Sequence, residues 1–171
     1  MMWTTIAQGA AAESRLWGDA LKPDHVGEPV FSPLAEERFA VGLETIYEGY
    51  LVHYGTPRLF APGDPDTALL LGDYLYAHGL VRIADAGDVD AVADLSELIS
   101  LCSQLRAENA EGDGALWAAT AALLGSGRAL DEARGALRLR GDAAPLDAVA
   151  RRAAGDSAVD SALAAHAGRV T

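Results

Sequence analysis

The sequence predicts an all-α protein, a helical bundle of about five to seven helices in a single domain. Half of its 171 residues are hydrophobic but only 6% are aromatic. Long Ala-rich stretches with few Val, Ile or Thr favour helices over strands. The length suits one compact core, so we expect one helical domain over residues 1–171: an N-terminal helix and Pro/Gly loop (1–33), a core (34–125) and Ala-rich C-terminal helices (126–171).

The first two helices are predicted from apolar spacing. Trp3, Ile6, Ala10, Trp17 and Leu21 fall on one helical face, and Pro23 stops that helix. A loop rich in Pro and Gly follows over 23–33. The second helix, 34–54, has a wide apolar face, and the sequence places Glu37, Glu44 and Glu48 on the other side.

The third helix, centred on 68–84, is apolar on nearly every side and carries one carboxylate, Asp73, in its middle. Asp64 followed by Pro65 is a typical N-terminal signature for it. A helix that is apolar all round is buried, and a buried Asp needs a partner. We therefore expect this to be the central helix, with Asp73 paired inside. Gly72, Asp73, His78 and Arg82 make it too polar for a membrane span.

The remaining helices are predicted with decreasing strength. A fourth begins at Asp88, its N-cap, and places Cys102 in the core. A fifth, over 114–124, surrounds Trp117 with Ala and Leu. Residues 129–140 and 145–167 are compatible with helices that pack on the outside of the bundle or fray, because their larger apolar side chains are thinly spaced.

Two glycine pairs stand out inside these helices: Gly42 and Gly49 lie seven residues apart, as do Gly72 and Gly79. A helical Gly costs about 1 kcal/mol relative to Ala, so such a pair indicates close approach of another group. Two interpretations are open: a tight helix crossing within the chain, or the approach of a ligand or partner.

The net charge of the chain limits the kinds of partner that we expect. The net charge of −12 argues against nucleic acid and anionic membranes as partners, since both are approached through clustered Lys and Arg. No basic stretch precedes an apolar core at the N-terminus, so no signal peptide is predicted and a cytoplasmic location is expected. His25, His53, His78 and His166 fall in different segments, so no metal cluster is expected.

Three carboxylates are candidates for chemistry. Glu44 and Glu48, four residues apart, can share a helix face and hold Mg²⁺ or can line a solvated surface. Asp73 can make a structural hydrogen bond or can serve a catalytic or metal role. The residues alone leave these alternatives open.

The stretch Leu69–Ala77, LLLGDYLYA, resembles the "LLAGDYLLA" helix of the trans-polyprenyl diphosphate synthases, which have the all-α terpenoid-synthase fold. Other pieces in the same order, between residues 34 and 125, are similar to further family segments. They are Glu44–Ile46 with Tyr50–His53 (family "EMIH..SLIHDD"), Gly55–Pro57 ("RRGKPT"), Ile99–Arg106 ("ELCRGQL") and Ala115–Ala119 ("KTASLFAAA").

The departures from the family pattern concern its metal chemistry. After His53, where the family has its first Asp-rich motif, this chain has Tyr54 and Gly55. Arg58 is the only counterpart of the family's paired arginines. The Lys of "KTA" is replaced near Asp113 and Gly114, and the sequence stops short of the second Asp-rich motif. Ionising an allylic diphosphate requires metal and basic groups, so independent prenyl transfer is not expected.

The resemblance implies a non-catalytic subunit, similar to the small subunit of heterodimeric, heptaprenyl-type synthases, whose catalytic partner would hold Mg²⁺. No cofactor of its own is expected. The alternatives are a homodimeric binding or scaffold protein holding an apolar, isoprenoid-like ligand, an enzyme using Glu44, Glu48 and Asp73, and an all-α domain whose likeness is accidental. The candidate structural, interface or channel residues are Gly42, Gly49, His53, Arg58, Gly72, Asp73, Tyr76, Gly79 and Gln104.

Overall fold

The computed structural model describes residues 1–24 and 27–170, and in these the chain is all-α, as predicted. His25 lies outside the described residues. Besides two isolated β-bridges, the described part contains nine α-helices and three short 3₁₀ helices, η1 (Ser32–Leu34), η2 (Glu37–Phe39) and η3 (Gly127–Leu130). The α-helices are α1 (Met2–Glu13), α2 (Arg15–Asp19), α3 (Ala40–Tyr54), α4 (Pro65–Asp85), α5 (Val89–Ala107), α6 (Asp113–Ala122), α7 (Asp131–Arg140), α8 (Ala144–Ala154) and α9 (Asp156–Ala167).

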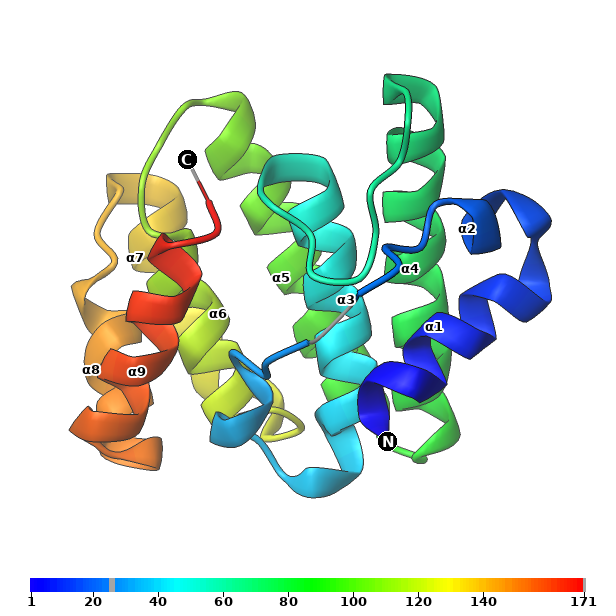
Figure 1. The fold of residues 1–171 in the computed structure, drawn as a ribbon. Helices are drawn as coiled ribbons and strands as arrows, with labels where there is room; N and C mark the ends of the chain where they lie inside the picture. The colour runs from blue at the N-terminus through cyan, green and yellow to red at the C-terminus, as the bar shows by residue number, and fades with distance from the viewer. Residues whose placement is uncertain (25–26, 171) are drawn as a thin grey trace.

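The number of helices exceeds the expected five to seven because two predicted helices are each divided. Ser14 has an extended backbone and its side chain accepts a hydrogen bond from Leu16 N, which ends α1 and caps α2. Gly155 adopts a positive φ of 87° between α8 and α9, a conformation that favours glycine. In Figure 1, α1 and α2 flank α4 on one side of the molecule, and α7, α8 and α9 form the opposite side.

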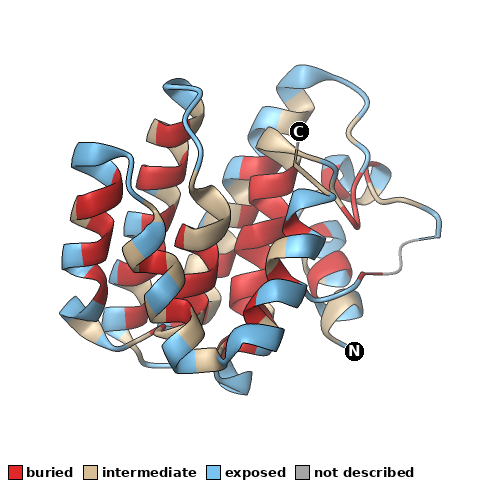
Figure 2. Cartoon of the chain, turned by 90° about the vertical axis from the view of Figure 1, so that its left-hand side faces the viewer, coloured by how far each residue is buried: buried red, intermediate tan, exposed pale blue. Residues whose placement is uncertain are grey.

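The central helix is α3, which corrects the expectation that 68–84 is central. Every residue of α3 from Gly42 to Leu51 is buried. By contrast, α4 buries one side and leaves Leu69 and Leu70 each 56% exposed. Figure 2 shows the buried residues gathered on the inward sides of the helices and the exposed ones on outer turns and loops. High apolar content in α4 therefore does not reflect complete burial.

Two helix starts form as the sequence predicts. The Asp64 side chain accepts from Thr67 N at 2.9 Å ahead of Pro65, and Asp88 accepts from Ala91 N at 2.9 Å. Each carboxylate satisfies a backbone donor that lacks a partner within the helix. These local contacts determine where α4 and α5 begin.

The core has a main part around α3, α5 and α6 and a smaller part between α1, α2 and α4. Cys102 is fully buried in the main part, as predicted. The C-terminal helices are packed against it, because Leu137, Leu146 and Val159 are all buried. Within the described residues, no helix combines the length and hydropathy needed to cross a membrane.

Candidate functional site

The four glycines of α3 and α4 face one another inside the molecule. A Cβ on Gly49 would lie 2.9 Å from the carbonyl oxygen of Gly72, and one on Gly79 would lie 2.9 Å from that of Gly42. All four are buried, so the glycines permit a close crossing of the two helices. This confirms the tight-crossing interpretation and corrects the idea that the glycine-bearing faces form a surface for a partner.

Asp73 lies at the surface, which corrects its predicted burial. Its side chain is 66% exposed, and its Oδ1 lies 3.1 Å from Nε2 of His53. His53 packs over Gly72, where an added Cβ would lie 2.4 Å from the imidazole. Burial lowers the pKa of His53 by more than the nearby Asp73 carboxylate raises it. The contact joins α3 to α4 at the rim of their crossing.

Tyr76 and Gln104, two further predicted site residues, do not join this contact through hydrogen bonds. The Tyr76 ring lies beside His53, with the ring centroids 5.2 Å apart. Its hydroxyl is buried and has no hydrogen-bond partner among the described residues, and burial raises its pKa. Gln104 donates to Glu108, the residue directly after α5, at 3.0 Å. The predicted residues thus do not converge on one site.

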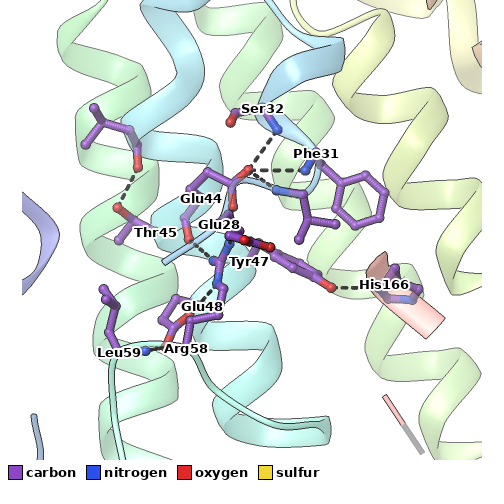
Figure 3. Close-up of polar contacts among 12 residues, drawn as sticks. Glu28, Phe31, Ser32, Glu44, Thr45, Tyr47, Glu48, Arg58, Leu59 and His166 are labelled. Carbon is purple, nitrogen blue, oxygen red and sulfur yellow. Dashed lines mark hydrogen bonds and ion pairs between the residues drawn. The ribbon is translucent and has the colours of Figure 1, made fainter. Parts of the chain in front are cut away.

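Glu44, Glu48 and Arg58 form a fully buried charged cluster (Figure 3). Each of the three side chains is 0% exposed, and Arg58 pairs with both carboxylates, with Nε 2.9 Å from Glu48 Oε2. This corrects the alternative in which Glu44 and Glu48 line a solvated surface. Helical periodicity alone did not predict their burial, because the Arg that neutralises them comes from the loop after α3.

The cluster also satisfies backbone groups of two loops. Glu44 Oε1 accepts from the backbone N–H groups of Val30, Phe31 and Ser32 at 2.8–3.1 Å. Glu48 Oε1 accepts from Leu59 N at 2.7 Å. Burial lowers the pKa of Arg58, but the two carboxylates raise it by more, so the guanidinium stays charged. The acids of α3 therefore hold the loops around Val30 and Leu59 against the helix.

This arrangement does not fit a metal site at Glu44 and Glu48. Three of the four carboxylate oxygens have ordinary hydrogen-bond partners at 2.7–3.1 Å, and the fourth, Glu44 Oε2, is paired with Arg58. A cation would have to displace a buried guanidinium that already satisfies both acids. Among the described residues, no three His, Cys, Asp or Glu side chains lie close enough together to hold a metal ion.

A second polar cluster, which the sequence reasoning missed, joins α3, α5, α6 and α9. Tyr47 Oη lies 2.9 Å from His166 Nδ1 (Figure 3), and His166 Nε2 lies 3.1 Å from Asp113 Oδ2. Tyr50 donates to the same Asp113 oxygen. Arg106 donates to that oxygen at 2.8 Å and to Tyr50 Oη at 2.7 Å. Buried Tyr residues need partners for their hydroxyls, and this was the signal that could have found the cluster.

Asp113 is the anionic centre of this second cluster. Burial raises its pKa, but hydrogen bonds from His166 and Tyr50, together with the charges of His166 and Arg106, lower it by more, so the net pKa lies below the usual range. Arg106 and Asp113 are 24% and 18% exposed, and Arg106 lines a shallow hollow together with Tyr54 and Ser103. Tyr47 is fully buried. The geometry favours a structural link between α9 and α3.

The outer face of α4 takes part in neither of these two clusters. We use this name for Asp66, Leu69, Leu70, Asp73, Ala77 and Val81, all of which are exposed. They follow helical spacing on one side of α4. Leu69, Leu70 and Val81 are 55–56% exposed.

The chain was compared with protein-family models, with curated proteins and with solved structures, and no match was found in any of the three comparisons.

Proposed function

We propose that the chain is a non-catalytic helical subunit that associates with a catalytic polyprenyl diphosphate synthase in isoprenoid or quinone side-chain biosynthesis in the cytoplasm. The partner would hold the Mg²⁺. The observation that carries the proposal is the outer face of α4, which lies on the helix that resembles the family most and leaves large apolar side chains in solvent.

The acids of α3 support the non-catalytic part of the proposal. The resemblance aligns α3 with the family helix that leads into the metal-binding aspartates. In this chain Glu44 and Glu48 are fully buried and paired with Arg58. Carboxylates so engaged serve folding, since releasing them would leave buried charge unpaired. Metal-assisted ionisation of a diphosphate would need ligands from another chain.

The outer face of α4 supports the association part. Exposed apolar patches rimmed by polar residues are typical of protein–protein contacts. Leu69 and Leu70 are each about half exposed, so covering each would contribute about 1 kcal/mol, roughly half the value for complete burial. Asp66 and Asp73 at its rim would orient a partner through charge.

The experiment combines this protein with the polyprenyl synthase encoded nearest to its gene. Co-purification, and prenyl transfer that rises or changes in product length only in the mixture, are the expected results. Leu70→Asp should abolish both effects, whereas Leu139→Asp, at an 80% exposed position on α7, should leave them intact. A mixture that neither co-purifies nor differs in activity from the synthase alone would refute the proposal. Mg²⁺-dependent turnover by the isolated chain would show that it is itself an enzyme.

A further inference from the structure

A groove of about 370 Å³ lies between α7 and α8, on the opposite side of the molecule from α4 (Figure 1). Ala133 and Ala136 of α7 and Ala148 and Val149 of α8 line it with small apolar side chains. Such a surface accepts the apolar face of a helix, because small residues allow close approach.

Two arginines of the groove lack partners. Arg140 and Arg152 line it and are exposed, and neither makes an ion pair or hydrogen bond within the described part of the chain. Nearby arginines are paired: Arg138 lies 2.8 Å from Glu97, and Arg151 lies 2.8 Å from Asp147. In a chain of net charge −12, two unpaired guanidinium groups beside one groove favour an acidic occupant.

The spacing of the arginines describes that occupant further. A three-residue connection, 141–143, joins the C-terminal end of α7 to the N-terminal end of α8, and both helices line the groove over most of their length. Arg140 then lies at the end of the groove near Pro145, and Arg152 lies seven residues farther along α8. Seven helical residues span about 10 Å. A matching helix would carry two carboxylates two turns apart with apolar side chains between them.

The outer face of α4 has this pattern. Asp66 and Asp73 are seven residues apart, and Leu69 and Leu70 lie between them and are each 56% exposed. Asp73 also pairs with His53, yet its side chain stays 66% exposed. Because groove and face lie on different sides of one molecule, they can meet only between two copies.

We infer that the outer face of α4 of one copy docks into the α7–α8 groove of a second copy. The contact is heterologous, so each added copy presents a new free groove and a new free face, and the assembly grows into a chain or closes into a ring. This contact does not depend on a catalytic partner. It uses the same face of α4 as the proposed function, so a second copy and a synthase would compete for it.

Sedimentation velocity of the full chain over a wide concentration range tests the inference. The wild type should show mass that grows beyond a dimer. Leu69→Asp with Leu70→Asp removes the face, and Arg140→Glu with Arg152→Glu reverses the groove charge. Each double variant should weaken self-association about tenfold or more, since like charges then oppose each other. Leu139→Asp is the matched surface control and should associate as the wild type does.

Mixing the two double variants is the decisive step. One retains its groove and the other retains its face, so an equimolar mixture should form a one-to-one dimer and nothing larger. A wild type that is monomeric throughout, a mixture that stays monomeric, or a closed dimer that only the α4 variant disrupts would overturn the inference. Synthase binding by the Arg140→Glu, Arg152→Glu variant, which keeps the face, reports on the proposed function separately.

Glu132 supplies a second, independent readout. It lines the groove on α7, near the Arg152 end, where its charge opposes an acidic occupant. Glu132→Gln should therefore strengthen self-association, and higher salt should weaken it in the wild type. Weaker association of Glu132→Gln would overturn the assigned occupant.

Discussion

Replacing Arg58 with Met tests whether the buried cluster holds the fold together. Met fills a similar volume but has no charge and no donor. The change removes the partners of Glu44 and Glu48, both 0% exposed, and a donor to the carbonyl oxygen of Glu28. It also removes the guanidinium that lies 4.5 Å from the Trp3 ring.

The expected loss follows from the burial. Removing one partner of a buried ion pair costs about 3–5 kcal/mol, because the remaining charge is left uncompensated. Whole domains are stable by about 5–15 kcal/mol, so the variant should lose a large part of its free energy of unfolding. For a chain of this size, the loss corresponds to a Tm lower by about 6–20 °C.

Urea denaturation followed by circular dichroism measures the change, and Arg15→Met is the matched control. Arg15 pairs with Asp19 at 3.5 Å, but the two side chains are 94% and 69% exposed, so its loss should leave stability unchanged. Adding Glu48→Gln to Arg58→Met should recover part of the loss by removing one unpaired charge. If Arg58→Met were no less stable than Arg15→Met, the cluster would not carry the stability assigned to it.

Three further predictions concern other buried contacts. The pKa of Asp113 is lowered in the folded state, so its contribution to the free energy of unfolding is complete above about pH 4, the usual Asp pKa, and is lost as pH falls through the lower folded pKa. Asp113→Asn should therefore reduce the loss of stability at acid pH, as measured by denaturation at several pH values, and an unchanged loss would contradict the assignment. Gly79→Ala should lose about 1–3 kcal/mol by overpacking, since its Cβ would lie 2.4 Å from Ile46. Gly135→Ala, with open space around it, should instead raise the free energy of unfolding by about 0.5–1 kcal/mol. Calorimetry measures both changes, and similar shifts for the two glycine variants would contradict a tight crossing. Tyr76→Phe should keep or raise Tm, because the hydroxyl that it removes is buried and has no hydrogen-bond partner within residues 1–24 and 27–170; a clear fall in Tm would contradict this.

The two acids of α3 and the single acid in the middle of α4 lie in environments opposite to those expected from the sequence. Helical periodicity placed Glu44 and Glu48 on the side of their helix opposite its apolar face, and the apolar surroundings of Asp73 predicted that it is buried. In the fold, Glu44 and Glu48 are fully buried and Asp73 is 66% exposed. Both helices are rich in apolar residues, so composition alone could not decide which one is surrounded on all sides.

The polar cluster around Asp113 was hidden for a related reason. Tyr47 and His166 are 119 residues apart, and Tyr50 and Asp113 are 63 apart. No spacing rule connects residues at such separations, because their contact depends on how α6 and α9 pack on α3. A buried tyrosine predicts that a partner exists but does not identify it.

The sequence by itself determined the all-α class, the starts of α4 and α5 at Asp64 and Asp88, and the close approach at the glycine pairs. Each of these depends on interactions within a few residues or on the missing Cβ of glycine. Only the tertiary structure decided that α3 is central, that Arg58 neutralises two buried acids, and which face of α4 meets solvent. These outcomes depend on segments brought together by packing, and an ion pair or an exposed face is defined only once its surroundings are in place.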